Sequence, residues 1–145
     1  MVLALEHQEG ENMREILFRG KSMSDGEWVQ GSLVITTIEP ANDAPFKHYH
    51  IEDMTIGVFP NEFQSGLSET VIPSTVGQYT GLTDKNGKKI FEGDVVRLWC
   101  GTHGTFELCV SDIRNGLMPV GAENIKEIEI IGNIHDNPEL TEGWA

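Results

Sequence analysis

The chain is poor in basic residues, cysteines and long apolar runs. Its 145 residues include 10 Lys and Arg against 23 Asp and Glu, which gives a formal net charge of -13. This charge repels phosphate backbones and anionic membrane surfaces over roughly 8 to 10 Å, the Debye length at ordinary salt. We therefore expect no non-specific nucleic-acid binding. The acidity indicates solubility first, and as an alternative a ligand for a basic protein partner.

Targeting and anchoring signals are also missing. No segment approaches the roughly 18 apolar residues that a membrane-spanning helix needs. The apolar patch at residues 1–6 has neither a basic region before it nor a small-residue cleavage site after it, unlike a secretory signal. Because Cys100 and Cys109 are the only thiols, we expect free cysteines in a reducing cytoplasm and no membrane partner.

Motifs that carry known chemistry are absent. The sequence has no Gly-x-Ser-x-Gly elbow, no phosphate-binding Walker loop and no Gly-x-Gly-x-x-Gly fingerprint. With 23 acidic residues, choosing a glycosidase-like pair of carboxylates would be arbitrary. The sequence thus predicts a protein that is not an enzyme, with no catalytic or metal site and no cofactor.

What the sequence does contain is the pattern of a mainly β protein. Apolar residues recur at period two or in short β-branched runs, and 16 glycines with Asp-Gly and Asn-Gly pairs punctuate them as hairpin turns would. This predicts small antiparallel sheets, or an SH3-like or partly open barrel that could have two lobes. We expect strands at 15–20, 27–36, 48–58, 76–79, 94–99, 105–110, 117–120 and 127–134, and a helical turn at 122–126.

Two local signals refine this prediction. The polar turn at 84–88, followed by Gly93 and the strand at 94–99, is typical of a tight corner in a small barrel. In the last strand, Ile131 and Gly132 break the alternation of Ile and Glu, which indicates a β-bulge.

The composition changes between residues 37 and 74, where prolines and acidic residues interrupt the apolar pattern. We interpret residues 13–140 as one domain, in which an N-terminal β lobe with a variable insertion (13–74) precedes a small-barrel lobe (75–140). Residues 141–145 form a tail. Residues 1–12 are expected to be a poorly ordered extension, with Met13 as an alternative start.

Three blocks resemble the YopX family of phage and prophage proteins. They cover residues 14–33, residues 75–96 with Gly-Leu-Thr-Asp-Lys-Asn-Gly-Lys at their centre, and residues 131–140 with Ile-Gly-Asn-Ile-His-Asp-Asn-Pro. The resemblance implies a mostly β fold and an origin in a bacteriophage or integrated prophage. It implies no activity, substrate, cofactor or site residue.

The most metal-like motif is His48-Tyr49-His50 with Glu52. Residues two apart on a strand project from one face, so these side chains could offer two imidazoles and a carboxylate. Asp53 adds a second carboxylate nearby. A mononuclear site would need a further ligand placed by the fold, and His-x-His on a strand is far more often a solvated polar face, so we predict no metal there.

A second constellation joins Cys100, His103 and Cys109, since a hairpin could bring the two cysteines onto opposite strands. The paired Cys-x2-Cys knuckle of a zinc site is missing, so core packing of the thiols is the preferred interpretation.

A third cluster combines Lys85, Lys88 and Lys89 with Tyr79 and Phe91, a mixture that a barrel could use to stack single-stranded nucleic acid. The preferred interpretation is a solvated hairpin tip with Phe91 in the core. Trp28 and Trp99 are likewise expected to pack in the core or between lobes.

The leading hypothesis is a non-enzymatic phage or prophage accessory protein that acts by binding a protein partner or a second copy of itself, for example through open strand edges. One alternative is a nucleic-acid-associated module or an acidic mimic of DNA. The other is an unrecognised metal-dependent enzyme with its site in the middle lobe.

Overall fold

The computed structural model describes residues 15–53, 67–110 and 125–143, and within them the secondary structure is β-strand and short 3-10 helix. In chain order the strands are β1 (Phe18–Lys21), β2 (Trp28–Ile38), β3 (Phe46–Asp53), β4 (Leu67–Thr70), β5 (Gly77–Thr83), β6 (Lys89–Phe91), β7 (Asp94–Trp99), β8 (Thr105–Cys109) and β9 (Glu127–Asn133). The 3-10 helices are η1 (Pro73–Thr75), η2 (Gly101–His103) and η4 (Pro138–Thr141). No helix in the described ranges is long and apolar enough to cross a membrane.

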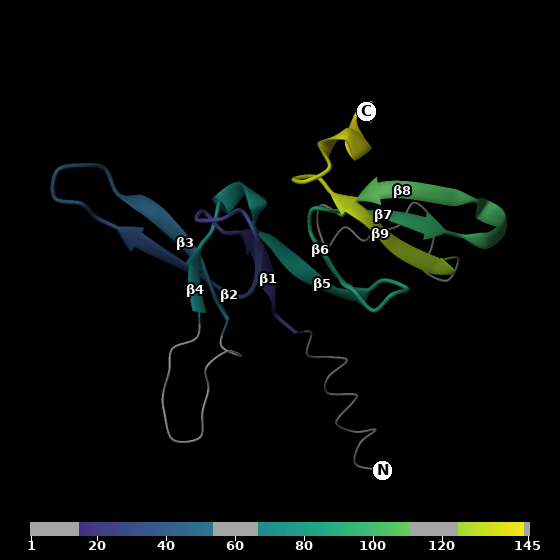
Figure 1. Cartoon of the computed structure of the whole chain (residues 1–145), viewed down its shortest axis with the longest axis horizontal. Coiled ribbons are helices and arrows are strands. Elements are labelled where there is room, and N and C mark those ends of the chain that lie inside the picture. The colour runs from purple at the N-terminus through teal and green to yellow at the C-terminus, as the bar shows by residue number, and fades with distance from the viewer. Residues whose placement is uncertain (1–14, 54–66, 111–124, 144–145) are drawn as a thin grey trace, which may run out of the picture.

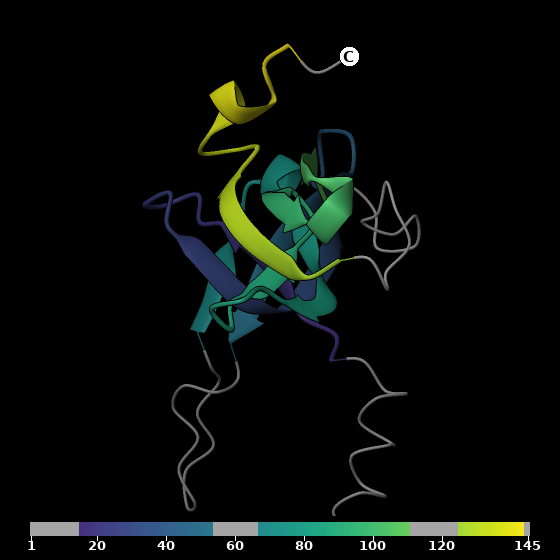
Figure 2. The same cartoon turned by 90° about the vertical axis from the view of Figure 1, so that its right-hand side faces the viewer.

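Two antiparallel sheets follow one another along the long axis of the molecule (Figure 1). The first has the order β4-β3-β2-β1-β5-β6, and the second has the order β8-β7-β9. The two sheets meet where β6 leads into β7. Seen along the long axis, β9 crosses in front of the first sheet and η4 continues beyond its end (Figure 2). The prediction of a mainly β protein with small antiparallel sheets is confirmed, and the sheets do not close into a barrel.

The barrel alternative fails because the chain's pairings leave outer strands on both sheets. β5 pairs with β1 on one side and β6 on the other, so it belongs to the first sheet. β7 pairs with β8 and β9, and neither of these pairs with a strand of the first sheet in the described ranges. The described parts of residues 37–74 supply the end of β2, all of β3 and β4, and η1 to the first sheet.

The main core lies between β6 and the second sheet. Its central side chains are at most 1% exposed, and they are Ile90, Val96, Leu98, Cys100 and Val110. On β7, Leu98 faces this core while its neighbours Arg97 and Trp99 are exposed, as the two-residue period of a strand requires. Partly buried side chains of β8 and β9 cover the cluster. This core positions the N-terminal end of β7 at the junction of the sheets.

The turn between β5 and β6 is organised by Asp84, whose carboxylate accepts the backbone N–H groups of Asn86 and Lys88, both at 2.9 Å. Its second oxygen accepts the N–H of Ile130 on β9 at 3.2 Å. Burial acts to raise the pKa of Asp84, but these N–H groups together hold it below its ordinary value. Gly87 has a φ of 82°, which only glycine adopts readily. The predicted corner at 84–88 is therefore real, and it ties the first sheet to the second.

Most predicted strands are found with shifted ends. The prediction at 94–99 matches β7 at both ends, and the bulge is confirmed, because Val95 pairs with Gly132 and Val96 with Ile130, which leaves Ile131 unpaired. β4 and β6 were missed because three or four residues show no readable alternation. Residues 54–58, 117–120 and 122–124 of the predictions lie outside the described residues, and residues 125–126 are not helical.

The alternation on β7 yields a matched test of the core. Leu98 is fully buried, and its neighbour Trp99 is 48% exposed on the opposite face. We expect Leu98→Ala to lower the free energy of unfolding by about 2 to 5 kcal/mol, because it leaves a cavity in packed apolar surroundings. We expect Trp99→Ala to change it by about 0.5 kcal/mol or less, although it removes the larger side chain. Urea denaturation followed by far-UV circular dichroism measures both, and equal effects would contradict the assignment of this core.

Candidate functional site

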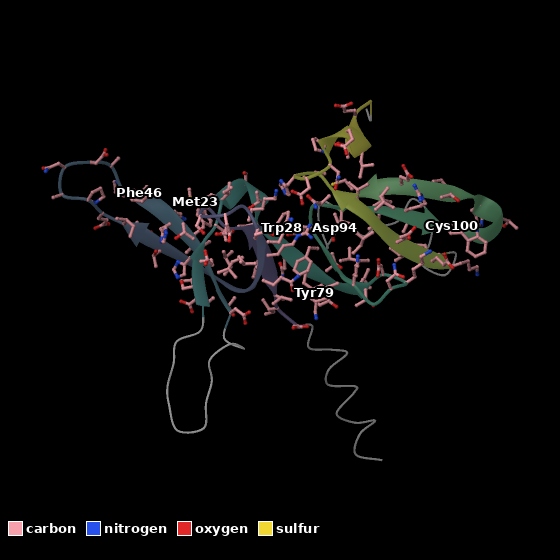
Figure 3. All side chains as sticks on the ribbon, viewed as in Figure 1. Met23, Trp28, Phe46, Tyr79, Asp94 and Cys100 are labelled. Carbon is pink, nitrogen blue, oxygen red and sulfur yellow. The ribbon has the colours of Figure 1, made fainter. Side chains whose placement is uncertain are left out.

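Charged and aromatic side chains from both sheets gather at the junction, where Figure 3 labels Trp28 and Asp94 near the middle of the molecule. The first sheet contributes side chains from β1, β2 and β6. The second contributes the start of β7, the last residue of β9 and the segment that follows it. We call this group the junction cluster, and its members are Arg19, Lys21, Trp28, Phe91, Asp94, Asn133 and Asp136.

The centre of the junction cluster is a buried ion pair between the two sheets. Arg19 Nη2 lies 2.8 Å from Asp94 Oδ1, and the two side chains are 11% and 2% exposed. Asp94 Oδ2 also accepts the backbone N–H of Phe91 at 2.7 Å. Burial raises the pKa of Asp94, and the positive charge of Arg19 opposes that rise. Each charge of the pair is therefore compensated chiefly by the other.

The guanidinium of Arg19 is also held by aromatic rings. Its central carbon lies 4.5 Å from the ring centroid of Trp28 and 5.0 Å from that of Phe91. Its Nε and Nη2 atoms are buried without a well-directed hydrogen bond. Cation–π attraction and the charge of Asp94 together replace the water that Arg19 loses on folding.

Asp136 forms the second half of the junction cluster. Its carboxylate accepts hydrogen bonds from Trp28 Nε1 at 2.8 Å and from Asn133 Nδ2 at 3.1 Å, and it pairs with the ammonium of Lys21. These contacts, led by that with Lys21, hold the pKa of Asp136 far below its usual range. Burial and the charge of Arg19 lower the pKa of neighbouring His135. The segment after β9 is thereby fastened to β1 and β2.

A cleft of about 490 Å³ opens at the junction cluster. Its lining residues are Arg19, Trp28, Gln30, Lys88, Lys89, Phe91, Asp94, Ile130, Gly132, Asn133 and Asp136. The volume is in the range of small-molecule sites. However, both acidic groups of its wall are already paired with Arg19 and Lys21. The arrangement therefore acts first as a lock between the sheets.

The histidine motif does come together on one face. The rings of His48 and His50 lie 5.4 Å apart, and His50 Nε2 lies 3.5 Å from Glu52 Oε1. His48 Nε2 is 3.0 Å from Thr70 Oγ1 on β4, which uses one of its ring nitrogens. No group of three or more His, Cys, Asp or Glu in the described ranges is arranged to hold a metal ion. The neighbouring Asp53 ends β3.

The cysteine constellation does not come together. Cys109 pairs with Val95 at one end of the β7–β8 hairpin, while Cys100 follows β7 at the other end, beside His103 in η2. Cys100 is 1% exposed within the main core, and both thiols are free. Burial raises the pKa of Cys109, which keeps it a protonated thiol. The prediction of core packing is confirmed for Cys100, whereas Cys109 is only partly buried and lies outside the main core.

The lysine cluster lies at the β5–β6 hairpin, but its aromatic residues are not available to a ligand. Phe91 and Tyr79 are 1% and 7% exposed, and their rings pack 5.6 Å apart. Lys85 lies 3.7 Å from carboxylate oxygens of both Glu127 and Glu129. The preferred interpretation, a solvated tip with Phe91 in the core, is confirmed. Trp28 packs at the junction as expected, but Trp99 is exposed.

A further feature, which residue spacing did not reveal, is the outer half of the β2–β3 hairpin. The hairpin extends away from the rest of the molecule, with Phe46 near its tip (Figure 3). Phe46, Ile35 and Ile38 are 54%, 47% and 40% exposed. We call residues 33–49 the hairpin arm.

One comparison with known proteins identifies a family. The model of the family described as YopX protein matches residues 17–142. No curated protein matches the chain. Among solved structures, the crystal structure of protein EF1440 from Enterococcus faecalis is 23% identical in sequence, with a TM-score of 0.43, and the match covers 90% of this chain and 100% of that one.

The buried pair makes a strong prediction for stability. We expect Asp94→Asn to lower the free energy of unfolding by about 3 to 5 kcal/mol, because it leaves the charge of Arg19 buried without a counter-ion. The matched control is Glu107→Gln, which breaks the 2.8 Å pair with Arg97 where the side chains are 47% and 40% exposed. There we expect a loss of about 0 to 1 kcal/mol. Chemical denaturation at neutral pH measures both, and equal losses would show that Arg19 finds compensation elsewhere.

Asp136 makes the junction sensitive to acid. Its pKa is lower in the folded chain than in the unfolded chain, so its ionised form adds stability that is present above the unfolded value of about 3.9 and lost as the pH falls towards the folded value. We expect Asp136→Asn to be less stable than wild type at neutral pH, and the difference to shrink steadily below about pH 4. Denaturation curves across this range measure it. A difference that is constant with pH would contradict this role of the carboxylate.

Proposed function

Because the chain belongs to the YopX family, we propose that it is an accessory protein of a bacteriophage or integrated prophage that acts without catalysis, by binding another protein chain. The observation that carries this proposal is the hairpin arm, which exposes apolar side chains beyond the sheet that supports it. Single exposed apolar residues are ordinary on protein surfaces, but a group of them on a projecting element is typical of an interaction site.

The sheet leaves the hairpin arm uncovered because its other strands are short. β1 pairs with β2 only as far as Gly31. β4 pairs with β3 from His50 onward, and directly after β4 the N–H of Val71 donates to the carbonyl of Tyr49 at 3.0 Å. Beyond these points the arm is a two-stranded ribbon, and such a ribbon buries too little apolar surface to gain much stability by itself. A partner that covers the arm would supply the missing contacts.

Apolar groups occupy both faces of the arm. Ile38 lies opposite Phe46 on one face, and Ile35 lies opposite Tyr49 on the other. Complete burial of one such side chain contributes about 1.5 to 3 kcal/mol. A small number of apolar anchors is the usual energetic centre of a protein interface. The arm therefore carries enough apolar surface to anchor a partner protein.

Nucleic acid is the weaker candidate for the partner. Stacking on single strands needs exposed aromatic faces, whereas Tyr79 and Phe91 are buried. Lys85, which would contact phosphate, lies close to two glutamates. The net charge of -13 adds a general repulsion.

The hairpin arm gives the proposal a direct test. The tagged chain is used to recover its protein partner from nuclease-treated lysate of its induced host. We expect the double variant Ile38→Thr, Phe46→Ser to recover at least tenfold less of that partner than the wild-type chain, because it removes a cross-strand pair of apolar anchors. The matched control is Leu82→Ser, which polarises a side chain that is 41% exposed on β5. Circular dichroism confirms that both variants fold. A partner that the double variant retains in full would contradict a role for this face.

A further inference from the structure

One edge of β2 has no neighbour over most of its length. β3 pairs with Ser32–Ile38 on one side of β2, and β1 pairs with Trp28–Gly31 on the other side. On the β1 side, Glu15 and Leu17 line a small cleft beside Ser32. From Leu33 to Ile38, that edge pairs with no strand in the ranges that the structure describes. In an antiparallel pair, the backbone N–H and C=O groups of every second residue point away from the partner strand, so those of this stretch point away from β3.

Outer strands are normally protected against pairing with other chains. The outermost strands of the two sheets, β4, β6, β8 and β9, have such protection. Each carries charge along its edge, and the charged residues are Glu69 on β4, Lys89 on β6, Glu107 on β8 and Glu127 with Glu129 on β9. β4 and β6 are also very short. Charge and shortness are the usual means by which native sheets avoid edge-to-edge association.

The open edge of β2 has none of this protection. All 11 residues of the strand are uncharged, and Leu33–Ile38 contains neither Gly nor Pro. Five consecutive residues, Val34–Ile38, are β-branched, which favours extended pairing. An uncharged, β-branched edge is the kind that recruits another strand. Its composition therefore indicates that a strand normally covers it.

We infer that the strand covering this edge is β2 of a second copy of the chain, so that two first sheets join into one continuous antiparallel sheet across a two-fold axis. The inference rests on the proposed function and names the partner. In the register centred on Ile35, this residue faces its own copy, Val34 faces Thr36, and Leu33 faces Thr37. Each of these cross-strand pairs is neutral, and pairs among β-branched and apolar residues stabilise a sheet.

Charge restricts where two copies can meet. Two chains that each carry a charge of -13 repel one another over most of their surfaces. They can approach where acidic residues are missing, and β2 is uncharged from Trp28 to Ile38. A two-fold axis brings the same uncharged edge of both copies together, so neither β2 strand places an acidic side chain in the contact. Added salt screens the remaining repulsion, so it should strengthen the pairing.

Sedimentation equilibrium of the full chain over a range of concentrations tests the inference. We expect a dimer whose dissociation constant falls as salt is added. Ile35→Lys should raise that constant at least tenfold, because it places two ammonium groups opposite each other at the axis. The matched control Trp99→Lys adds the same charge at a site of equal exposure, 48% against 47%, and should leave the dimer unchanged.

A cross-link fixes the register independently of any effect on folding. In the proposed dimer, Ile35→Cys places two thiols opposite each other at a Cα separation of about 4.5 to 5.5 Å, within disulfide reach. We expect mild oxidation to yield a covalent dimer with Ile35→Cys and none with Trp99→Cys. A wild-type chain that stays monomeric, or a dimer that Ile35→Lys leaves intact, overturns the pairing of β2. The wild-type chain could instead be monomeric and capture another protein that the Ile38→Thr, Phe46→Ser variant does not capture. That result overturns only the identity of the partner, and the proposed function stands.

Discussion

The ion pair between Arg19 and Asp94 is the contact on which the arrangement of the two sheets depends. It joins β1 to β7 in a place where both side chains are almost fully removed from water. A buried charge without its partner would cost several kcal/mol, so arrangements of the sheets that separate the two charges are strongly disfavoured. Trp28, Phe91 and Asp136 complete this lock by covering the guanidinium and by fastening the segment after β9.

Because the ion pair and its neighbours lie at the junction of the two sheets, they do not stabilise the hairpin arm at the opposite end of the molecule. The main cluster of buried apolar side chains lies around β6 and β7, and Ile51 and Val71 are buried in the first sheet. In contrast, Ile35, Ile38 and Phe46 on the outer half of the hairpin arm are exposed. A β-sheet is stable in water only when enough of its surface is covered. The hairpin arm is left uncovered in this way and is therefore available to a partner. It offers one edge of β2 and the two faces of the β2–β3 hairpin.

The features that could be predicted from the sequence are local ones. β7 was predicted at both ends because Val95, Val96 and Leu98 form a β-branched and apolar run between clear turn signals. The bulge at Ile131 was visible because one residue breaks an otherwise regular alternation. β4 and β6 were missed, since strands this short have no period to read and exist because longer neighbours pair with them. For the cysteine motif, nearness along the chain was not nearness in space, since Cys100 and Cys109 lie at opposite ends of the β7–β8 hairpin.

By itself, the sequence determined the class of fold, the turn at 84–88, the family and the acidity, because each of these is carried by residues close together in the chain or by their sum. The tertiary structure alone decided which strands became edges and which charged residues met. Trp28 and Asp136 are 108 positions apart, and Arg19 meets Asp94 only because β1 and β7 are brought to one junction. Such contacts depend on pairing between distant strands, and that pairing is governed by which surfaces the whole chain can bury together rather than by any local pattern.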